Sequence, residues 1–487
     1  MKANKKTVTS NVLWRFFERT GAQGVNFIVS LILARLLEPK VYGVVALVTV
    51  FTAILQIFVN CGFSSALIQK KNPDSLDYSS VFYFNLLSCV VLYALLFGFA
   101  PLIAKFYEMP ELTSIIRVMG ITLLIGGING MQHTYVSKNL MFKRFFFATL
   151  GGTIGAGVIG IWMAYRGYGV WALVASNLFN SAVDTIILWV TVKWRPTKEF
   201  SLNRLKALFS FGWKMLASNI LDVVYDKIRQ LIIGKMYSAE DLAFYNKGDT
   251  FPNMLISNID TSLNSVLFPS MAAAQDNMES LKNMTRRSLK TSTYLIMPMM
   301  VGLAVCAEPV ISIILTDKWL PCVPFLRIFC FTYAFYPVHT SNLNAIKASG
   351  RSDIFFKLEI IKKAVDLAAI LSTMWFGVMA MAYSLLFTSI AGQIINSYPN
   401  KKLMKYSYLE QLKDMLPNIG LSLFMGAAVF SINFIQLNDI LKLIIQVPLG
   451  MAIYFGLSKL FKIDSFEYVL GIAKSFIKKR NKKETAE

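Results

Sequence analysis

Long apolar stretches separated by short polar segments recur along the whole chain. Each stretch is about 20 residues long, the length that an α-helix needs to cross roughly 30 Å of hydrocarbon. The apolar residues follow one another without the strict alternation of a transmembrane β-strand, so the pattern predicts helices rather than a barrel. About fourteen membrane-spanning helices are predicted in an all-α polytopic protein, at residues 12–37, 42–69, 78–104, 112–136, 145–165, 168–192, 211–236, 242–271, 288–315, 322–346, 354–376, 378–398, 416–435 and 440–460.

The pattern repeats at a displacement of about 200 residues. Residues 33–36 fall on residues 233–236, and Arg117 falls on Arg327. Each copy holds six predicted spans, so both copies share one orientation and an axis along the membrane normal relates them. We therefore expect two pseudo-symmetric six-helix lobes plus two extra helices. The predicted divisions are residues 1–200 and 201–405 for the lobes, 406–461 for the additional spans, and 462–487 for a basic amphipathic cytoplasmic tail.

Composition and charge support a membrane protein. The chain of 487 residues is 55% hydrophobic and only 16% charged, too apolar for a row of soluble domains. Its net charge of +21 gathers in alternate short connections, which under the positive-inside rule places both termini in the cytoplasm. With the charge confined to short loops, no nucleic-acid partner is expected. The basic connections lie around residues 2–6, 70–71, 138–144, 193–206, 282–287, 347–351 and 401–413.

Several predicted spans carry polar residues along one helical face. The first span holds Arg15 and Arg19, and the seventh holds Asp222, Asp226 and Arg229. Because a charge at the bilayer centre costs roughly 2.5–3.5 kcal/mol, such faces should turn away from lipid. Equivalent polar faces in two copies would then meet across a central hydrated cavity. The cations predicted to bind an anionic substrate there are Arg15, Arg19, Arg229, Lys247, Lys290, Lys362 and Lys363.

The eleventh span breaks the symmetry of the repeat. Glu359, Lys362, Lys363 and Asp366 lie on one helical face, whereas the matching residues 149–156 of the fifth span are uncharged. One interpretation is a structural set of ion pairs; the other is that the lysines bind an anionic ligand and the carboxylates hold them while the site is empty. Arg15 and Lys290 also have an alternative role, snorkelling to inner-leaflet headgroups.

Carboxylates inside the spans suggest coupling of transport to an ion gradient. Either H⁺ or Na⁺ could be the coupling ion. Asp184 in the sixth span has no evident partner in the sequence, and His133 and His339 stand alone. No metal site and no other cofactor is expected, since zinc needs three or four clustered ligands. The candidate ion-coupling residues are Asp222, Asp226, Asp260 and Asp366.

Five short motifs resemble the signature of bacterial polysaccharide transporters. They are residues 33–39, 42–43, 62–69, 245–249 and 266–269. This family belongs to the multidrug, oligosaccharidyl-lipid and polysaccharide exporter superfamily and includes flippases of O-antigen, colanic acid and teichuronic acid type. The resemblance implies alternating access around a cationic cavity. It also implies that an undecaprenyl-pyrophosphate-linked oligosaccharide repeat unit crosses the bacterial plasma membrane for lipopolysaccharide or exopolysaccharide biosynthesis.

Two other functions stay open at this point. A small-cation or drug exporter of the same superfamily would need aspartates to dominate the cavity. A membrane glycan polymerase or ligase would need a large outer loop, and the outer connections are short. No sugar-nucleotide, P-loop or nucleophile motif is present, so we do not expect an enzyme. The expected partners are the lipid-linked substrate, membrane lipids and polysaccharide polymerases, with the chain acting as a monomer.

Overall fold

The structure is a computed structural model that describes residues 5–60, 62–275 and 277–471. The side chains of residues 5–20, 59–60, 211, 214–215, 262–263 and 265–266 lie outside this description. The contacts divide the chain into two compact units, Met1–Ala243 and Phe244–Glu487. Within the described residues the regular structure is entirely helical. The two units are taken one at a time below.

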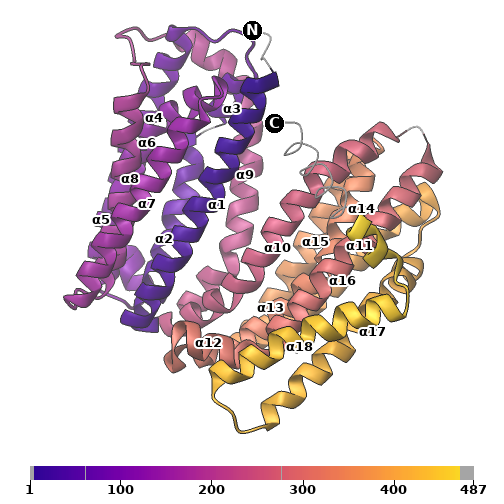
Figure 1. The fold of residues 1–487 in the computed structure, drawn as a ribbon. Coiled ribbons are helices and arrows are strands. Elements are labelled where there is room, and N and C mark those ends of the chain that lie inside the picture. Colours follow the sequence, from indigo (N-terminus) through magenta and orange to yellow (C-terminus); the bar gives the residue numbers. More distant parts are fainter. Residues whose placement is uncertain (1–4, 61, 276, 472–487) are drawn as a thin grey trace, which may run out of the picture. The chain divides into compact units, whose positions relative to one another are not determined.

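The first unit consists of helices that run alongside one another (Figure 1). Its long helices exceed the length needed to cross a bilayer, and two short ones, α3 and α5, lie between longer neighbours. The elements are α1 (Lys5–Leu36), α2 (Pro39–Asn60), α3 (Phe63–Gln69), α4 (Ser75–Phe106), α5 (Leu112–Met119), α6 (Ile121–Lys138), α7 (Phe142–Tyr165), α8 (Val170–Thr191), α9 (Leu202–Met236) and the start of α10 (Ala239–Ala273).

Small residues let α7 approach its neighbours closely. A Cβ atom on Gly155 would lie 2.5 Å from Phe179 of α8, and one on Gly157 would lie 2.4 Å from Val29 of α1. Membrane helices associate through such close packing because lipid provides no hydrophobic driving force between them. The uncharged residues of the fifth predicted span therefore form a packing surface, with α1 and α8 on two sides of α7.

Helix α9 packs within the first unit, although the sequence repeat assigns it to the second copy. It contacts α2, α3 and α4. Gly62 permits one of these contacts: its φ of 68° is left-handed, and a Cβ atom there would lie 2.3 Å from the carbonyl oxygen of Gly212. The compact unit thus ends at Ala243, whereas the repeat divides the sequence near residue 200. The predicted lobe boundaries refer to the sequence repeat and not to the compact units, and they stay a prediction.

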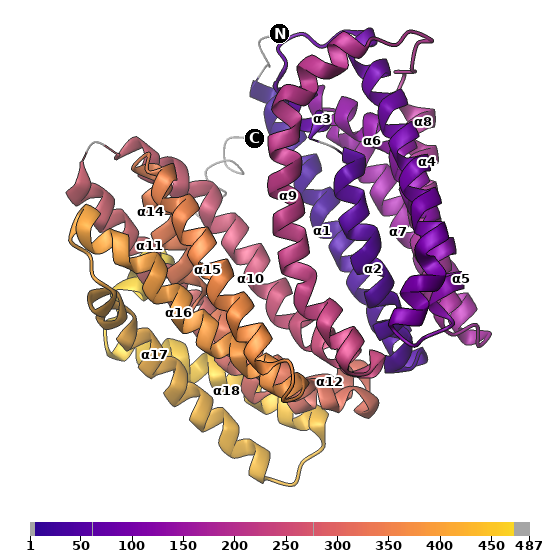
Figure 2. The same ribbon diagram turned by 180° about the vertical axis from the view of Figure 1, so that it is seen from behind.

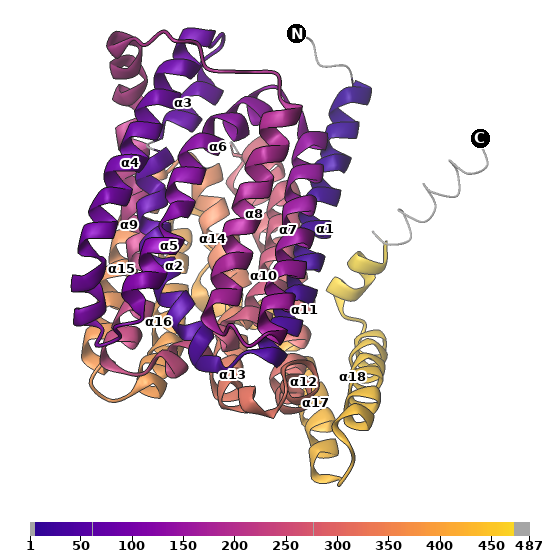
Figure 3. The same cartoon turned by 90° about the vertical axis from the view of Figure 1, so that its left-hand side faces the viewer.

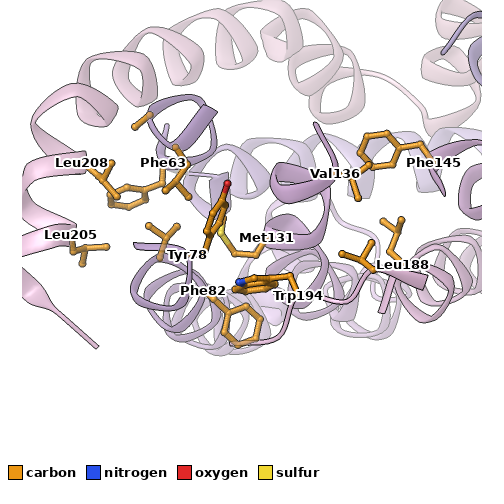
Figure 4. Packing of buried hydrophobic residues seen from close by; sticks show 14 of the residues in the cluster. Phe63, Tyr78, Phe82, Met131, Val136, Phe145, Leu188, Trp194, Leu205 and Leu208 are labelled. Atoms are coloured by element: carbon orange, nitrogen blue, oxygen red, sulfur yellow. The ribbon is translucent and has the colours of Figure 1, made fainter. Parts of the chain in front are cut away.

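The connection that leads into α9 is fastened to the beginning of α4. The backbone N–H of Thr197 donates to the Ser79 hydroxyl at 2.9 Å, and that of Ser201 donates to Ser80 at 2.9 Å. Arg204 lies 3.4 Å from Asp77, a fully buried carboxylate. An apolar cluster fills the space behind these contacts (Figure 4). Among its members are Phe63, Tyr78, Phe82, Met131, Trp194, Leu205 and Leu208.

The second unit holds most of α10 and all later helices. Figure 2 shows α14, α15 and α16 running alongside one another. The elements after α10 are α11 (Met278–Val305), α12 (Ala307–Leu315), the 3₁₀ helix η1 (Asp317–Cys322), α13 (Val323–Ala334), α14 (Tyr336–Ala348), α15 (Ser352–Thr373), α16 (Val378–Met404), α17 (Tyr408–Phe430), the 3₁₀ helix η2 (Ser431–Phe434) and α18 (Asp439–Leu460).

The last two long helices, α17 and α18, lie next to each other (Figure 3), and both pack on α11. Asp414 of α17 is buried and accepts hydrogen bonds from Arg286 of α11 at 2.6 Å and from the Tyr406 hydroxyl at 2.8 Å. Tyr454 of α18 donates to the Tyr294 carbonyl of α11 at 2.8 Å. Polar bonds therefore join these helices to α11.

Ten helical segments of the described chain are long and apolar enough to cross a membrane, so this is a multi-pass membrane protein. Three other helices that were predicted to span, α9, α10 and α15, are long, but their described residues do not reach that apolarity, because charged residues lower the mean hydropathy. In α1 the described side chains, Gly21–Leu36, form an apolar stretch that is shorter than a span. The count of fourteen spans stays a prediction. The ten segments are Pro39–Phe58, Ser75–Phe106, Leu112–Lys138, Phe142–Tyr165, Val170–Thr191, Met278–Val305, Asp317–Ala348, Val378–Met404, Tyr408–Phe434 and Asp439–Leu460.

Candidate functional site

A polar network inside the second unit begins where α10 meets α13. Tyr333 of α13 donates its hydroxyl to Asp249 of α10 at 2.7 Å, and Asn253 donates its amide to the same carboxylate at 3.2 Å. These residues lie on a helix that also buries Lys247, which is 7% exposed with its Nζ 5.4 Å from the centroid of the Trp319 ring. One side of α10 is therefore polar and turned toward its own unit.

The network continues along α10 to α14. Asn264 donates to Asp260 at 2.8 Å, and Asn344 of α14 donates to Asn264 at 2.5 Å. Thr340, one helical turn before Asn344, lies near the Asp260 carboxylate. Polar side chains of α10 and α14 thus gather near one carboxylate, which a lipid-facing position could not provide.

Helix α15 brings a cation to the same network. Lys362 donates to Glu359 at 2.6 Å, and the two side chains are 20% and 30% exposed. Tyr336 of α14 lies within electrostatic reach of both Asp260 of α10 and Glu359 of α15. Lys362 in turn lies within electrostatic reach of His339, whose Nδ1 is 2.9 Å from the Asn396 amide nitrogen.

The charged face of α15 is partly open to solvent. Within the second unit α15 packs against α14 and α16. Lys362, Lys363 and Asp366 are half-buried rather than buried. We call Asp260, Tyr336, His339, Glu359 and Lys362 the α15 network. It combines a movable cation with carboxylates, an arrangement able to exchange an internal partner for an anionic ligand.

The predicted site residues do not all lie together. Asp260, Lys362, Lys363 and Asp366 belong to the α15 network or to the charged face of α15, and Lys363 and Asp366 make further interactions. Lys290 lies elsewhere in the second unit, 3.7 Å from Asp414 and 3.6 Å from Asp464. Arg229 is buried in α9, where Asp222 and Asp226 are exposed. The side chains of Arg15 and Arg19 lie outside the described residues. Whether these side chains bind substrate stays a prediction.

Sequence reasoning missed a second polar cluster, in the first unit. Asp184 of α8 accepts from the Asn129 amide at 2.6 Å and lies 2.8 Å from Nε2 of His133, both on α6. The His133 ring also stacks on Phe145 at 4.9 Å. Asp184, which has no evident partner in the sequence, therefore has two. The cluster could have been found from the spacing of four residues between Asn129 and His133, which places both side chains on one helical face.

The two clusters occupy related places in the sequence repeat. The displacement of 210 that relates Arg117 to Arg327 also relates Asn129 to His339, since 339 − 129 = 210. A displacement of 208 relates Asp184 to Gly392, since 392 − 184 = 208. A Cβ atom on Gly392 would lie 2.8 Å from the His339 ring, just as Asn129 contacts Asp184. The contact between α6 and α8 in the first copy therefore recurs between α14 and α16 in the second. Asp184 stands at this contact in the first copy, and Gly392 stands there in the second.

Arg117 and Arg327, which match each other in the sequence repeat, make equivalent bonds. The Nε of Arg117 donates to the Phe97 carbonyl at 3.3 Å, and that of Arg327 donates to the Ala304 carbonyl at 3.2 Å. Both arginines therefore bind backbone carbonyls of a preceding long helix, near its end. Over the part of the chain that the structure describes, no three His, Cys, Asp or Glu side chains are close enough to hold a metal ion.

The fold and the α15 network thus define an all-helical, multi-pass membrane protein with charged side chains inside its helices. Residues 32–324 match the family described as polysaccharide biosynthesis protein, and the chain belongs to this family. The resemblance seen in the sequence motifs is confirmed.

Related proteins cover nearly the whole chain. The succinoglycan biosynthesis transport protein ExoT of Rhizobium meliloti is 25% identical over 459 residues, which cover 88% of this chain and 92% of that protein. The teichuronic acid biosynthesis protein TuaB of Bacillus subtilis is 24% identical over 419 residues, covering 83% and 86%. Among solved structures, the lipid II flippase MurJ in an inward closed conformation has a TM-score of 0.74 at 15% identity, covering 93% of this chain and 99% of that chain. The fold is therefore that of a known flippase.

Proposed function

We propose that this protein is a flippase that moves an undecaprenyl-pyrophosphate-linked oligosaccharide repeat unit across the bacterial plasma membrane by alternating access. The observation that carries the proposal is the α15 network, in which Glu359 holds the half-buried Lys362 at 2.6 Å on the charged face of α15. Family membership and the likeness in fold to a lipid II flippase support the same function.

The chemistry of the network suits a pyrophosphate-linked sugar. An ammonium on a flexible stem can leave one carboxylate and bind a phosphate oxygen, since both are charge-assisted hydrogen bonds of similar strength. Amide and hydroxyl groups nearby, such as Asn264 and Tyr336, are suitable partners for sugar hydroxyls. In this proposal Glu359 holds Lys362 in place while no substrate is bound.

Coupling to H⁺ or Na⁺ belongs to the same proposal. Asp260 is half-buried and accepts a hydrogen bond from Asn264, so it is the best supported of the four candidate aspartates. Both termini lie in the cytoplasm, the chain acts as a monomer, and a polysaccharide polymerase receives the product on the outer side.

The direct test is translocation by the purified protein in liposomes that contain lipid-linked oligosaccharide from the source organism. Outward movement is measured as access of an added glycan-cleaving enzyme. We expect movement with the protein and none with empty liposomes. Absence of movement, together with normal surface polysaccharide in a deletion strain, would contradict the proposal. Export of small cations or drugs in its place would favour the alternative transporter.

A further inference from the structure

A basic cavity lies on the second unit, away from the α15 network. It has a volume of about 320 Å³ and is formed by α11 and the segment that follows α18. Arg286, Arg287 and Lys290 line it from α11, and Asp464, Ser465 and Tyr468 line it from the later segment. Three cations therefore face one small space.

Part of this positive charge is not neutralised by the surrounding carboxylates. Arg286 and Lys290 pair with Asp414, and Lys290 also pairs with Asp464, which is 87% exposed. Arg287 makes no ion pair among the described residues; its guanidinium lies 4.2 Å from the centroid of the Tyr468 ring. Two carboxylates thus accompany three cations, and a planar guanidinium able to bind two phosphate oxygens lines the cavity.

An apolar groove adjoins the basic cavity. It has a volume of about 460 Å³ and lies between α17 and the end of α18, lined by Pro417, Gly420, Leu421, Phe424, Leu457 and Phe461. Ile463 lines the groove, and the next residue, Asp464, lines the basic cavity. Asn418, next to Pro417, donates to the Lys290 carbonyl at 3.0 Å. The basic cavity and the apolar groove are therefore lined by consecutive residues of the segment that follows α18.

The length of α11 places the basic cavity at the depth of lipid headgroups. Its 28 residues make a helix of about 42 Å, roughly 12 Å longer than the hydrocarbon core. Arg286 is eight residues after the first residue of α11, about 12 Å along the axis. Because Lys282, Arg286 and Arg287 all lie at this end, the excess length belongs at the cytoplasmic face.

From this juxtaposition we infer that the basic cavity and the apolar groove together bind an anionic glycerophospholipid of the inner leaflet. The phosphate group occupies the basic cavity beside Arg287 and Lys290, and one acyl chain occupies the groove beside Gly420. Charge and shape favour this ligand, since inner leaflets are rich in anionic lipids and attract cations at their surface. The inference concerns a lipid that stays bound, and it holds whatever substrate the protein transports.

Two variants test the basic cavity and the apolar groove independently. Arg287→Gln removes the available guanidinium from the basic cavity. Gly420→Leu fills the groove, and its new side chain meets open space because no atom lies within 4 Å of the Cβ position. The matched controls are Lys401→Gln, an exposed cation at the end of α16, and Gly456→Leu, a glycine of α18 that also has open space and does not line the groove.

The measurement is native mass spectrometry of the full-length protein titrated with phosphatidylglycerol or with phosphatidylcholine. We expect the wild type to prefer phosphatidylglycerol and Arg287→Gln to weaken that binding about fivefold, the effect of one cation near a headgroup. Gly420→Leu should weaken it as well, because the new side chain takes the place of the acyl chain. Both controls should bind as the wild type does. Melting temperatures without added lipid should be equal for all five proteins.

Three results would overturn the inference. Equal binding of the two lipids would remove the role of charge. Unchanged binding by both test variants would place the lipid elsewhere. Displacement of phosphatidylglycerol by equimolar undecaprenyl phosphate would identify the occupant as a carrier lipid instead.

Discussion

At the scale of single residues, Lys362 connects the sequence prediction to a defined partner. Its bond of 2.6 Å to Glu359 agrees with both interpretations of the charged face, because a structural pair and an exchangeable pair look alike without ligand. The surroundings favour exchange, since Lys362 and Glu359 are both partly exposed. A substitution can separate the two interpretations.

Lys362→Gln is expected to slow translocation of lipid-linked oligosaccharide about tenfold or more, because a hydrogen bond to a charged group contributes about 1.5–3 kcal/mol. The assay is the liposome translocation described above. Lys357→Gln, which changes an exposed lysine of the same helix, is the control and should retain full activity. Equal activity of both variants, with equal melting temperatures, would assign Lys362 a structural role or none.

Asp74 provides a pH-dependent test outside the membrane. It caps α4 by accepting a hydrogen bond from the Asp77 backbone N–H at 2.8 Å. This bond, helped by the Asp77 side chain and Arg204, lowers the pKa of Asp74 below its usual 3.8. A lowered pKa in the folded state means that the stabilisation is present above pH 4 and is lost as the pH falls through the lowered value.

Asp74→Ala should therefore destabilise the protein by about 1 kcal/mol at pH 7, the usual effect of losing an N-cap. The difference from wild type should shrink as the pH is lowered from 5 to 2, measured as melting temperature in detergent. Glu111→Ala is a matched control, because Glu111 occupies the N-cap of α5 without a side-chain bond. A difference between wild type and Asp74→Ala that stays constant with pH would contradict this account.

At the scale of elements, polar contacts fix several helices to their neighbours. Apolar packing alone would not specify how these helices are placed against one another. Asp414 is the clearest case, since it joins α17 to α11 and to the chain just before α17. It is buried and accepts from Arg286 and from Tyr406, so removal of its charge leaves those donors without an anionic partner.

Asp414→Asn is expected to lower the free energy of unfolding by about 3 kcal/mol, the low end for breaking a buried ion pair. The low end applies because Arg286 is 48% exposed and can turn to water. Fluorescence-detected melting in detergent would measure the loss. Asp464→Asn should change it little, as Asp464 is 87% exposed. Similar losses in both variants would show that burial does not decide the effect.

Helices could be predicted from the sequence wherever local composition alone determines that a helix forms. Apolar runs of membrane length mark helices such as α4 and α18, because continuous hydrophobicity of that length has few other structural solutions. The sequence could not give the partners of Asp184 or place Lys290 beside Asp414, since both depend on which helices become neighbours. Neighbours follow from close-packing glycines such as Gly157, and a single sequence does not show which helix each glycine meets.

At the scale of the whole molecule, the compact units and the sequence repeat have different boundaries. α9 is equivalent to α1 in the repeat, yet it contacts α2, α3 and α4. Arg204 at its start pairs with Asp77, and Lys235 at its end pairs with Glu108 at 2.9 Å. The first unit is therefore complete only when residues beyond 200 are included.

A fragment of residues 1–243 should consequently be more stable than one of residues 1–200. The shorter fragment leaves the surfaces of α2 and α3 that contact α9 uncovered, together with the carboxylate of Asp77. Size-exclusion profiles after heating in detergent would compare the two, and we expect the longer fragment to stay monodisperse at higher temperature. Equal heat resistance would show that α9 adds nothing to the first unit.

The contacts of α9 also have a consequence for the order of events during synthesis. Ser79, Ser80 and Asp77 are made more than a hundred residues before their partners Thr197, Ser201 and Arg204. When α9 leaves the ribosome, its docking surface is already in the bilayer, while α11 to α18 do not yet exist. Assembly of the first unit can thus finish while translation continues, so a ribosome that stalls after residue 243 would release a packed intermediate rather than an open helix bundle.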